Sequence, residues 1–473
     1  MKTIFGFLDK PWFKQILVAA GPIAITCGLG MTEGYSAILL PQLQHENSTI
    51  KIDTQLSSLI ASMSALPMAG GCLLGGFFME KIGRRAIHIW SCLPLTLGWF
   101  LIALAPNTLI ILIGRFLTGV SDGLLGPPTG VYIAETSHPN ARGVLIMSTC
   151  VAITAGVFGV HLLGTFFTWR ITALISGLIP IPIVVLMFFV PESPTYLAKK
   201  GQVDAATKAF YWCRGESRES RKELEELIER QKNLDDAPKL CLLDQLKNLR
   251  DPKFWKPTLI ISVLFFTAQA TGSNAVASYS IKIIQECGLK GEIFDEYLAM
   301  VFMDSFRVLA SILSCVLVFK MTRRNLMKLS GFGVCISVFL LCLYLHFFGK
   351  SIQYHPLVVL ALLMSYVFFI AVGMIPLSWT MMGEIFPLAY RGVGTAITSL
   401  VCYVFLYLAV QTFPHFFEFF GSIIGNLGLY GVCTLVGTLV LVAYLPETKD
   451  KPLYEIEDSF VSGKGTRNAV KDT

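Results

Sequence analysis

The sequence predicts an all-α membrane protein whose twelve transmembrane helices form two pseudo-symmetric six-helix bundles. Hydrophobic residues make up 54% of the chain and charged residues only 15%, whereas a soluble domain carries roughly 25% charged residues. Apolar stretches of about 20 residues, the length that spans a bilayer, recur along the whole chain. Short charged motifs follow these stretches at matching places in both halves of the chain.

Twelve apolar segments are expected to cross the membrane, six before and six after a polar interruption. In the first half they cover 14–40, 55–79, 86–106, 108–134, 143–168 and 170–190. In the second half they cover 255–285, 295–318, 327–348, 355–382, 393–417 and 422–445. Because a backbone in lipid must satisfy its own hydrogen bonds, each segment is predicted to be a helix.

The polar segments divide the chain into five parts. The predicted parts are a tail (1–13), a first bundle (14–190), a linker (191–254), a second bundle (255–445) and a second tail (446–473). The linker contains RKELEELIERQ (221–231), whose charge pattern predicts amphipathic helices beneath the bundles.

The net charge of +6 is explained by loops on one face of the membrane, and nucleic acid is not an expected partner. The basic residues of these loops are Lys81, Arg84, Arg85, Arg142, Lys320, Arg323, Arg324, Lys328 and Arg391. Because basic loops favour the cytoplasmic side, both tails and the linker are predicted to be cytoplasmic. The expected location is the plasma membrane.

Two further features agree with this topology. The sequon Asn47-Ser48-Thr49 falls in the first loop on the predicted outer face, where glycosylation can occur. Most of the twelve cysteines lie within apolar spans, where thiols behave as small hydrophobic groups. Disulfides and metal ligation are therefore not expected.

Three charged motifs occur once in each half. Glu-x6-Arg-Gly appears as ETSHPNARG (135–143) and again within GEIFPLAYRG (383–392). GFFMEKIGRR (76–85) corresponds to VFKMTRR (318–324), and PESPTYL (191–197) to PETKDKPLYEIE (446–457). This order predicts a duplicated six-helix unit, an architecture found in many secondary transporters.

Over essentially its whole length the chain resembles the sugar porters of the major facilitator superfamily, which carry these three motifs. WTMMGEIFP (379–387) further resembles the insect-type facilitated trehalose and glucose transporters. The resemblance implies the major facilitator fold and facilitative transport of a sugar, trehalose or a hexose such as glucose, by alternating access. It implies a small sugar and the lipid bilayer as partners, with no cofactor, metal or obligate protein partner.

The resemblance also implies that the motif charges form a cytoplasmic gate while the inner face is closed. The predicted gate residues are Arg84, Arg85, Glu135, Arg142 and Glu192 in the first half and Arg323, Arg324, Glu384, Arg391 and Glu447 in the second. One exposed pair contributes only about 0.2–1 kcal/mol, but several together can bias states a few kcal/mol apart. Alternatively, these charges only anchor helix ends and fix the topology.

The second copy of the gate departs from the family pattern. Phe319 and Thr322 replace the acidic residue and the glycine that the family has before Arg-Arg. More of the gate function is therefore expected from Glu384 and Arg391.

A sugar site needs amide and hydroxyl groups, which both donate and accept hydrogen bonds, together with an aromatic surface. In AQATGSNAVASYS (268–280) the family's Gln, Gly, Asn and second Tyr positions are matched, whereas Ala268 and Ser278 differ from it. In the tenth span GMIPLSW (373–379) retains the family tryptophan and a proline. The predicted substrate-binding residues are Gln269, Ser273, Asn274, Tyr279, Trp379 and Tyr403.

Four ionisable residues lie inside the predicted spans: Glu33, Asp122, Asp304 and Arg307. Each costs roughly 2.5–3.5 kcal/mol to insert, so partners or a wet cavity are required. Asp304 and Arg307 are three residues apart and are expected to pair, and Arg115 is expected to serve a neighbouring helix.

Glu33 is the possible proton site. The proton-coupled relatives carry an Asp in a Gly-Tyr-Asp motif, which here reads Gly34-Tyr35-Ser36. Facilitated transport is therefore the expectation, and proton symport through Glu33 is the alternative. A structural role for Glu33 near the outer rim, held by hydrogen bonds, is the third interpretation.

Two features of the sequence are typical of other function classes. GVSDG (119–123) spells the hydrolase motif Gly-x-Ser-x-Gly, but that motif requires a strand–turn–helix setting. Inside an apolar helix it predicts a close-packing face instead, as do Gly71 and Gly75, so an enzyme is not expected. A sugar sensor that does not transport is the remaining alternative, because several pocket positions depart from the family.

Overall fold

The computed structural model describes residues 11–46, 48–235, 251–289, 295–349, 354–386, 391–449 and 460, apart from the side chains of 139, 140, 230–235, 391 and 392. The sequon residue Asn47, the guanidinium of Arg391 and most of the two predicted tails lie outside this part. The described residues are almost entirely helical, and they contain no strand. Within them, twelve helical segments are long and apolar enough to cross a membrane, which confirms the predicted all-α membrane fold.

The first half of the chain forms six spans. Their helices are α2 (Pro11–Gly34), α3 (Ser36–Gln44), α4 (Thr54–Ser62), α5 (Ala65–Ile82), α6 (Arg84–Ala103), α7 (Thr108–Thr136), α8 (Pro139–Phe166), α9 (Trp169–Leu178) and α10 (Pro180–Phe189). Three shorter helices follow in the linker: α11 (Pro194–Lys199), α12 (Val203–Arg214) and α13 (Arg218–Asp235).

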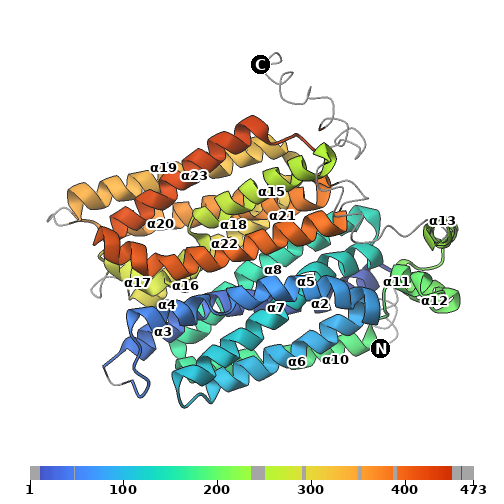
Figure 1. Cartoon of the computed structure of the whole chain (residues 1–473), viewed down its shortest axis with the longest axis horizontal. Helices are drawn as coiled ribbons and strands as arrows, with labels where there is room; N and C mark the ends of the chain where they lie inside the picture. The colour runs from blue at the N-terminus through green and yellow to red at the C-terminus, as the bar shows by residue number, and fades with distance from the viewer. Residues whose placement is uncertain are drawn as a thin grey trace.

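The second half forms six further spans. Its elements are α15 (Pro252–Ala270), α16 (Ser273–Ser278), α17 (Ser280–Glu286), α18 (Glu296–Lys320), α19 (Arg323–Phe348), α20 (Pro356–Phe369), the π-helix η2 (Ile370–Met374), α21 (Ile375–Ile385), α22 (Arg391–Phe420) and α23 (Ile423–Tyr444). The two halves lie side by side, with α11–α13 at one end of the molecule and α3, α4 and α17 at the other (Figure 1). We call these the linker end and the α3–α4 end.

Five of the described spans are not continuous α-helices. The second is divided between α4 and α5, and the sixth between α9 and α10. The first breaks at Tyr35, between α2 and α3. The seventh breaks at Gly272, which has a left-handed backbone with φ of +76°, a conformation that glycine adopts without strain. The tenth contains the π-helix η2 before Pro376, whose missing N–H cannot continue the α-helical pattern.

Glycines allow α5 and α7 to pack backbone against backbone. A Cβ atom on Gly75 would lie 2.4 Å from the Leu124 carbonyl oxygen, and one on Gly119 would lie 2.0 Å from that of Ser64. The Gly-x-Ser-x-Gly letters of α7 therefore form part of a helix crossing, which confirms the predicted packing face.

This crossing gives the first testable prediction. Gly75→Ala should lower the free energy of unfolding by about 1–3 kcal/mol, because the new methyl group overpacks the contact with Leu124. Gly76→Ala is the matched control, because a Cβ there meets no atom within 4 Å. The measurement is thermal unfolding of purified protein in detergent. Equal melting midpoints for the two variants would contradict the crossing.

Candidate functional site

A cavity of about 880 Å³ lies between the two halves. Helices α2 and α8 of the first half supply one wall, with side chains that include Glu33, Cys150 and Thr154. Helices α15, α16, α18, α21 and α22 and the π-helix supply the opposite wall. The spans that break at Tyr35 and at Gly272 and the span that contains the π-helix all contribute to the lining.

The amide groups predicted from the seventh span meet at this cavity. Asn274 Nδ2 donates to Gln269 Oε1 at 2.7 Å, and Gln269 Nε2 lies 3.5 Å from Cys402 Sγ on α22. The break at Gly272 makes this arrangement possible, because the two amides belong to different helices on either side of it. Ser273 also lines the cavity.

The predicted aromatic residues separate into two groups. Trp379 and Tyr403 line the cavity with ring centroids 6.5 Å apart, and Phe265 contacts Trp379 edge to face at 5.1 Å. Tyr279 is not among the lining residues. It stacks on Phe413 with centroids 4.7 Å apart and donates to the Val410 carbonyl at 3.3 Å. The structure therefore places Tyr279 in a packed layer toward the α3–α4 end.

Arg307 and Asp304 form the expected ion pair on α18, with Nη1 and Oδ1 2.8 Å apart. Asp304 Oδ2 also makes a short contact with His161 Nδ1, and His161 Nε2 lies 2.9 Å from the Gly34 carbonyl oxygen. His161 is on α8, so this chain of contacts connects the first half to the second. The sequence analysis did not find His161, because a single histidine in an apolar span carries no pattern of its own.

Arg115 supports the break in the first span. From α7 its guanidinium donates to the Thr32 carbonyl at 2.6 Å and to Ser36 Oγ at 2.8 Å, and it also reaches two carbonyl groups of α4. The prediction that Arg115 serves a neighbouring helix is confirmed. The bond to Thr32 matters because the interruption at Tyr35 removes that carbonyl from the regular helical pattern.

Glu33 does not lie near the outer rim, where a structural role was expected for it. Its side chain lines the central cavity rather than the outer rim. Within the described residues its carboxylate makes no hydrogen bond or ion pair. Asp122, by contrast, is 1% exposed inside α7 and does not line the cavity. Glu33 and Arg307 are therefore the two charged residues among those that line it.

The motif charges of the first half gather at the linker end. Arg84 pairs with Glu135 at 3.1 Å and with Glu80 at 2.7 Å. Glu192 accepts hydrogen bonds from the backbone N–H groups of Arg84 and Arg85, both at 2.9 Å. The positive end of the α6 dipole favours a carboxylate at this position.

The second half repeats this arrangement. Arg323 pairs with Glu384 at 2.7 Å, and Glu447 accepts from the backbone N–H of Arg323 at 2.9 Å and of Arg324 at 3.2 Å. Phe319 stands where the first half has Glu80, so Arg323 lacks a second carboxylate. Thr322, in place of the glycine, caps α19 by accepting from the Asn325 N–H at 3.3 Å.

In both clusters, every described ion pair joins residues of the same half. Arg142 does not take part, because no ion pair to its guanidinium is present among the described residues. The clusters therefore hold the helix ends of each half together, and in this structure they do not link the halves.

Polar contacts between the halves gather toward the α3–α4 end. Ser62 and Ser58 on α4 hydrogen-bond to the Gln411 side chain at 2.5 and 3.1 Å. Ser278 donates to the Glu33 carbonyl at 3.3 Å. Together with the contact between His161 and Asp304, these bonds join the halves on that side of the cavity.

One known family matches nearly the whole chain. The family described as "Sugar (and other) transporter" matches residues 30–460. The facilitated trehalose transporter Tret1 of Culex quinquefasciatus is 28% identical over 454 residues, which cover 95% of this chain and 86% of the relative. The Tret1-2 homolog of Drosophila sechellia is 27% identical, with coverages of 94% and 90%.

Other relatives are longer. Against the facilitated trehalose transporter Tret1 of Drosophila mojavensis, 28% identical, the chain spans about half the relative's length: the match covers 94% of this chain and 51% of that protein.

Solved structures show the same fold. The proton:xylose symporter XylE, bound to 6-bromo-6-deoxy-D-glucose, aligns with a TM-score of 0.74 at 20% identity, covering 93% of this chain and 98% of that one. The partially occluded inward-open conformation of XylE from E. coli gives a TM-score of 0.75 at 18% identity, with coverages of 93% and 99%. The predicted major facilitator fold is confirmed.

The ion pair of Asp304 and Arg307 yields the second prediction. Asp304→Asn should lower the melting midpoint in detergent strongly, because it leaves the buried guanidinium without a counter-charge, a loss of about 3–5 kcal/mol. The double variant Asp304→Asn/Arg307→Gln removes both charges and should recover most of the loss. If single and double variants melt at the same temperature, the pair does not contribute in this way.

Proposed function

Because the chain belongs to the family of sugar (and other) transporters, we propose that it carries a sugar across the membrane by facilitated diffusion. The observation that carries the proposal is the cavity between the two halves, which combines amides, hydroxyls and aromatic rings as a sugar requires. Trehalose and hexoses such as glucose are the proposed substrates, since several relatives bear the name of trehalose transporters.

Five predicted residues are proposed to contact the sugar: Gln269, Ser273, Asn274, Trp379 and Tyr403. The amide pair has donor and acceptor capacity left after its mutual hydrogen bond, and Trp379 offers a ring face to the apolar side of a sugar. Tyr279 is proposed instead to close the outer route, because its ring stacks on Phe413 next to the polar contacts between the halves.

The two charge clusters are proposed to hold the helix ends of each half together at the cytoplasmic side. Each cluster holds three spans of one half through an Arg–Glu pair and a capped helix start. Each half can then move as one body while the cavity changes its access. When the inner face closes, the ten gate residues approach those of the other half, and they separate when it opens.

The proposed location is the plasma membrane, with the linker end in the cytoplasm. The basic loops lie at the linker end, and the loop that bears the Asn47 sequon follows α3 at the opposite end. The positive-inside bias supports this orientation.

Proton symport is the second candidate function, and one observation favours it. Glu33 lines the cavity without a described hydrogen bond or ion pair. Its carboxyl group is therefore able to bind a proton that enters the cavity. The backbone neighbour of Glu33, the Gly34 carbonyl, is bound to the His161 ring.

The proposed function is tested by uptake. Purified protein in liposomes should take up radiolabelled glucose or trehalose down its gradient. Gln269→Ala and Asn274→Ala should each reduce the rate about tenfold, because each removes one or two hydrogen bonds to the sugar. Ser148→Ala is the control, since its hydroxyl bonds only to its own helix at 2.9 Å. No uptake of any carbohydrate by well-folded protein would reject transport.

The choice between facilitated diffusion and symport is tested by pH. Uptake should be the same at external pH 5.5 and 7.5, and Glu33→Gln should not introduce a pH dependence. A steep rise in uptake at acidic pH that disappears in Glu33→Gln would instead establish symport through Glu33.

A further inference from the structure

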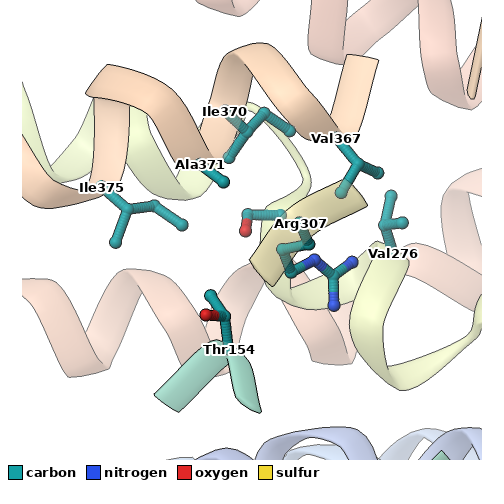
Figure 2. Close-up of a pocket in the computed structure, with 8 residues that line it drawn as sticks. Thr154, Val276, Arg307, Val367, Ile370, Ala371 and Ile375 are labelled. Carbon is teal, nitrogen blue, oxygen red and sulfur yellow. The ribbon is translucent and has the colours of Figure 1, made fainter. Parts of the chain in front are cut away.

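Arg307 gives the cavity a feature that a neutral sugar does not require. Its side chain lines the central cavity and also a smaller pocket of about 250 Å³ that shares Thr154, Ser273 and Ala371 with it. Figure 2 shows the guanidinium projecting into the space between Thr154 and Val276. Arg307 itself is only 7% exposed.

Most of the donor capacity of Arg307 is unused. Asp304 is its one described ion-pair partner, through Nη1. For Nε and Nη2 no hydrogen bond is found within the described part of the chain. These two atoms form the edge of the guanidinium that binds a carboxylate with two parallel hydrogen bonds.

Asp304 is held from two sides. Its Oδ1 pairs with Arg307 Nη1 at 2.8 Å, and its Oδ2 contacts His161 Nδ1 on α8. His161 Nε2 in turn lies 2.9 Å from the Gly34 carbonyl oxygen. These contacts keep the guanidinium in place and leave its Nε and Nη2 atoms available to a ligand.

Glu33 supplies a carboxyl group from the other half. It lines the same cavity from α2, and no described ion pair joins it to Arg307. A ligand that satisfies both residues has an anionic end for Arg307 and hydroxyl groups that donate to Glu33 and to the amides of Gln269 and Asn274. A polyhydroxy acid has this composition.

We propose that the substrates of this transporter include acidic sugars, whose carboxylate binds the free edge of Arg307 while their hydroxyl groups face Glu33 and the amide pair. This inference rests on the proposed function, because it names a substrate class for the same cavity. Asp304 and His161 act as positioning residues. They hold the Arg307 guanidinium in place and leave its Nε and Nη2 atoms free to bind the carboxylate.

The test compares two substrates of similar size. Liposomes with purified full-length protein are given radiolabelled D-glucuronate or D-glucose, at equal pH on both sides and with the membrane potential clamped at zero. The readout is the ratio of the two initial rates. Saturable glucuronate uptake that excess unlabelled D-gluconate inhibits more strongly than lactate is expected, because lactate has the carboxylate but only one hydroxyl.

Three variants test whether Arg307 causes the preference for glucuronate over glucose. Asp304→Asn/Arg307→Gln, which removes both charges together, should lower the glucuronate-to-glucose ratio at least tenfold. Arg307→Lys keeps the charge but loses the two-donor edge, so it should retain part of the preference. Ser305→Ala is the control on the same helix, since its hydroxyl bonds to the Val301 carbonyl of α18 at 2.8 Å, and its ratio should equal that of the unchanged protein.

The outcomes separate this inference from the proposed function. If glucose enters and glucuronate does not, or if the ratio is unchanged in the double variant, the acidic-sugar site is rejected and sugar transport remains. If neither substrate enters liposomes that contain correctly folded protein, both sugar transport and the acidic-sugar site are rejected.

Discussion

The constraint behind this architecture is the cost of a polar group in the hydrocarbon interior. Arg115 illustrates how the fold meets it. Its guanidinium is fully buried, yet it donates to Thr32, to Ser36 and to carbonyl groups of α4. The charge thereby becomes the junction of three spans, and it supports the carbonyl group that the break at Tyr35 releases. A residue that is costly in isolation holds the first half together.

The same constraint explains where the cavity lies. A helix that is interrupted in the membrane exposes backbone polar groups, which is tolerated only against protein or a wet space. The breaks at Tyr35 and Gly272 and the π-helix before Pro376 all lie at the cavity or beside it. At Gly272 the interruption divides one span into α15 and α16, and both of these helices line the cavity. Side chains from one span, such as Gln269 and Asn274, can therefore approach a ligand from two helices.

The sequence predicted the parts of this structure that depend on short-range pattern. Hydropathy located the twelve spans, and the spacing of Asp304 and Arg307 predicted their ion pair. The position of side chains around the cavity depends instead on how spans far apart in the chain meet. Tyr279 matched the family motif but packs on Phe413, because the turn after α16 directs it toward α22. Likewise, His161 gains its role only from Asp304, 143 residues later in the chain.

The comparison of the two charge clusters shows what the duplicated motifs require physically. The second half lacks the counterpart of Glu80 and the glycine before Arg-Arg, yet its Arg–Glu pair and its capped helix start have the same geometry as in the first half. Both halves therefore share two contacts. An arginine on one span pairs with a glutamate on another, and a second carboxylate accepts hydrogen bonds at the start of the helix that bears the arginine. Both contacts are internal to a half. Relative motion of the halves can then leave them intact, so the bonds that must change are those between the halves. They include the bonds of Gln411 to α4, of Ser278 to the Glu33 carbonyl, of His161 to Asp304 and of Thr380 to Met147.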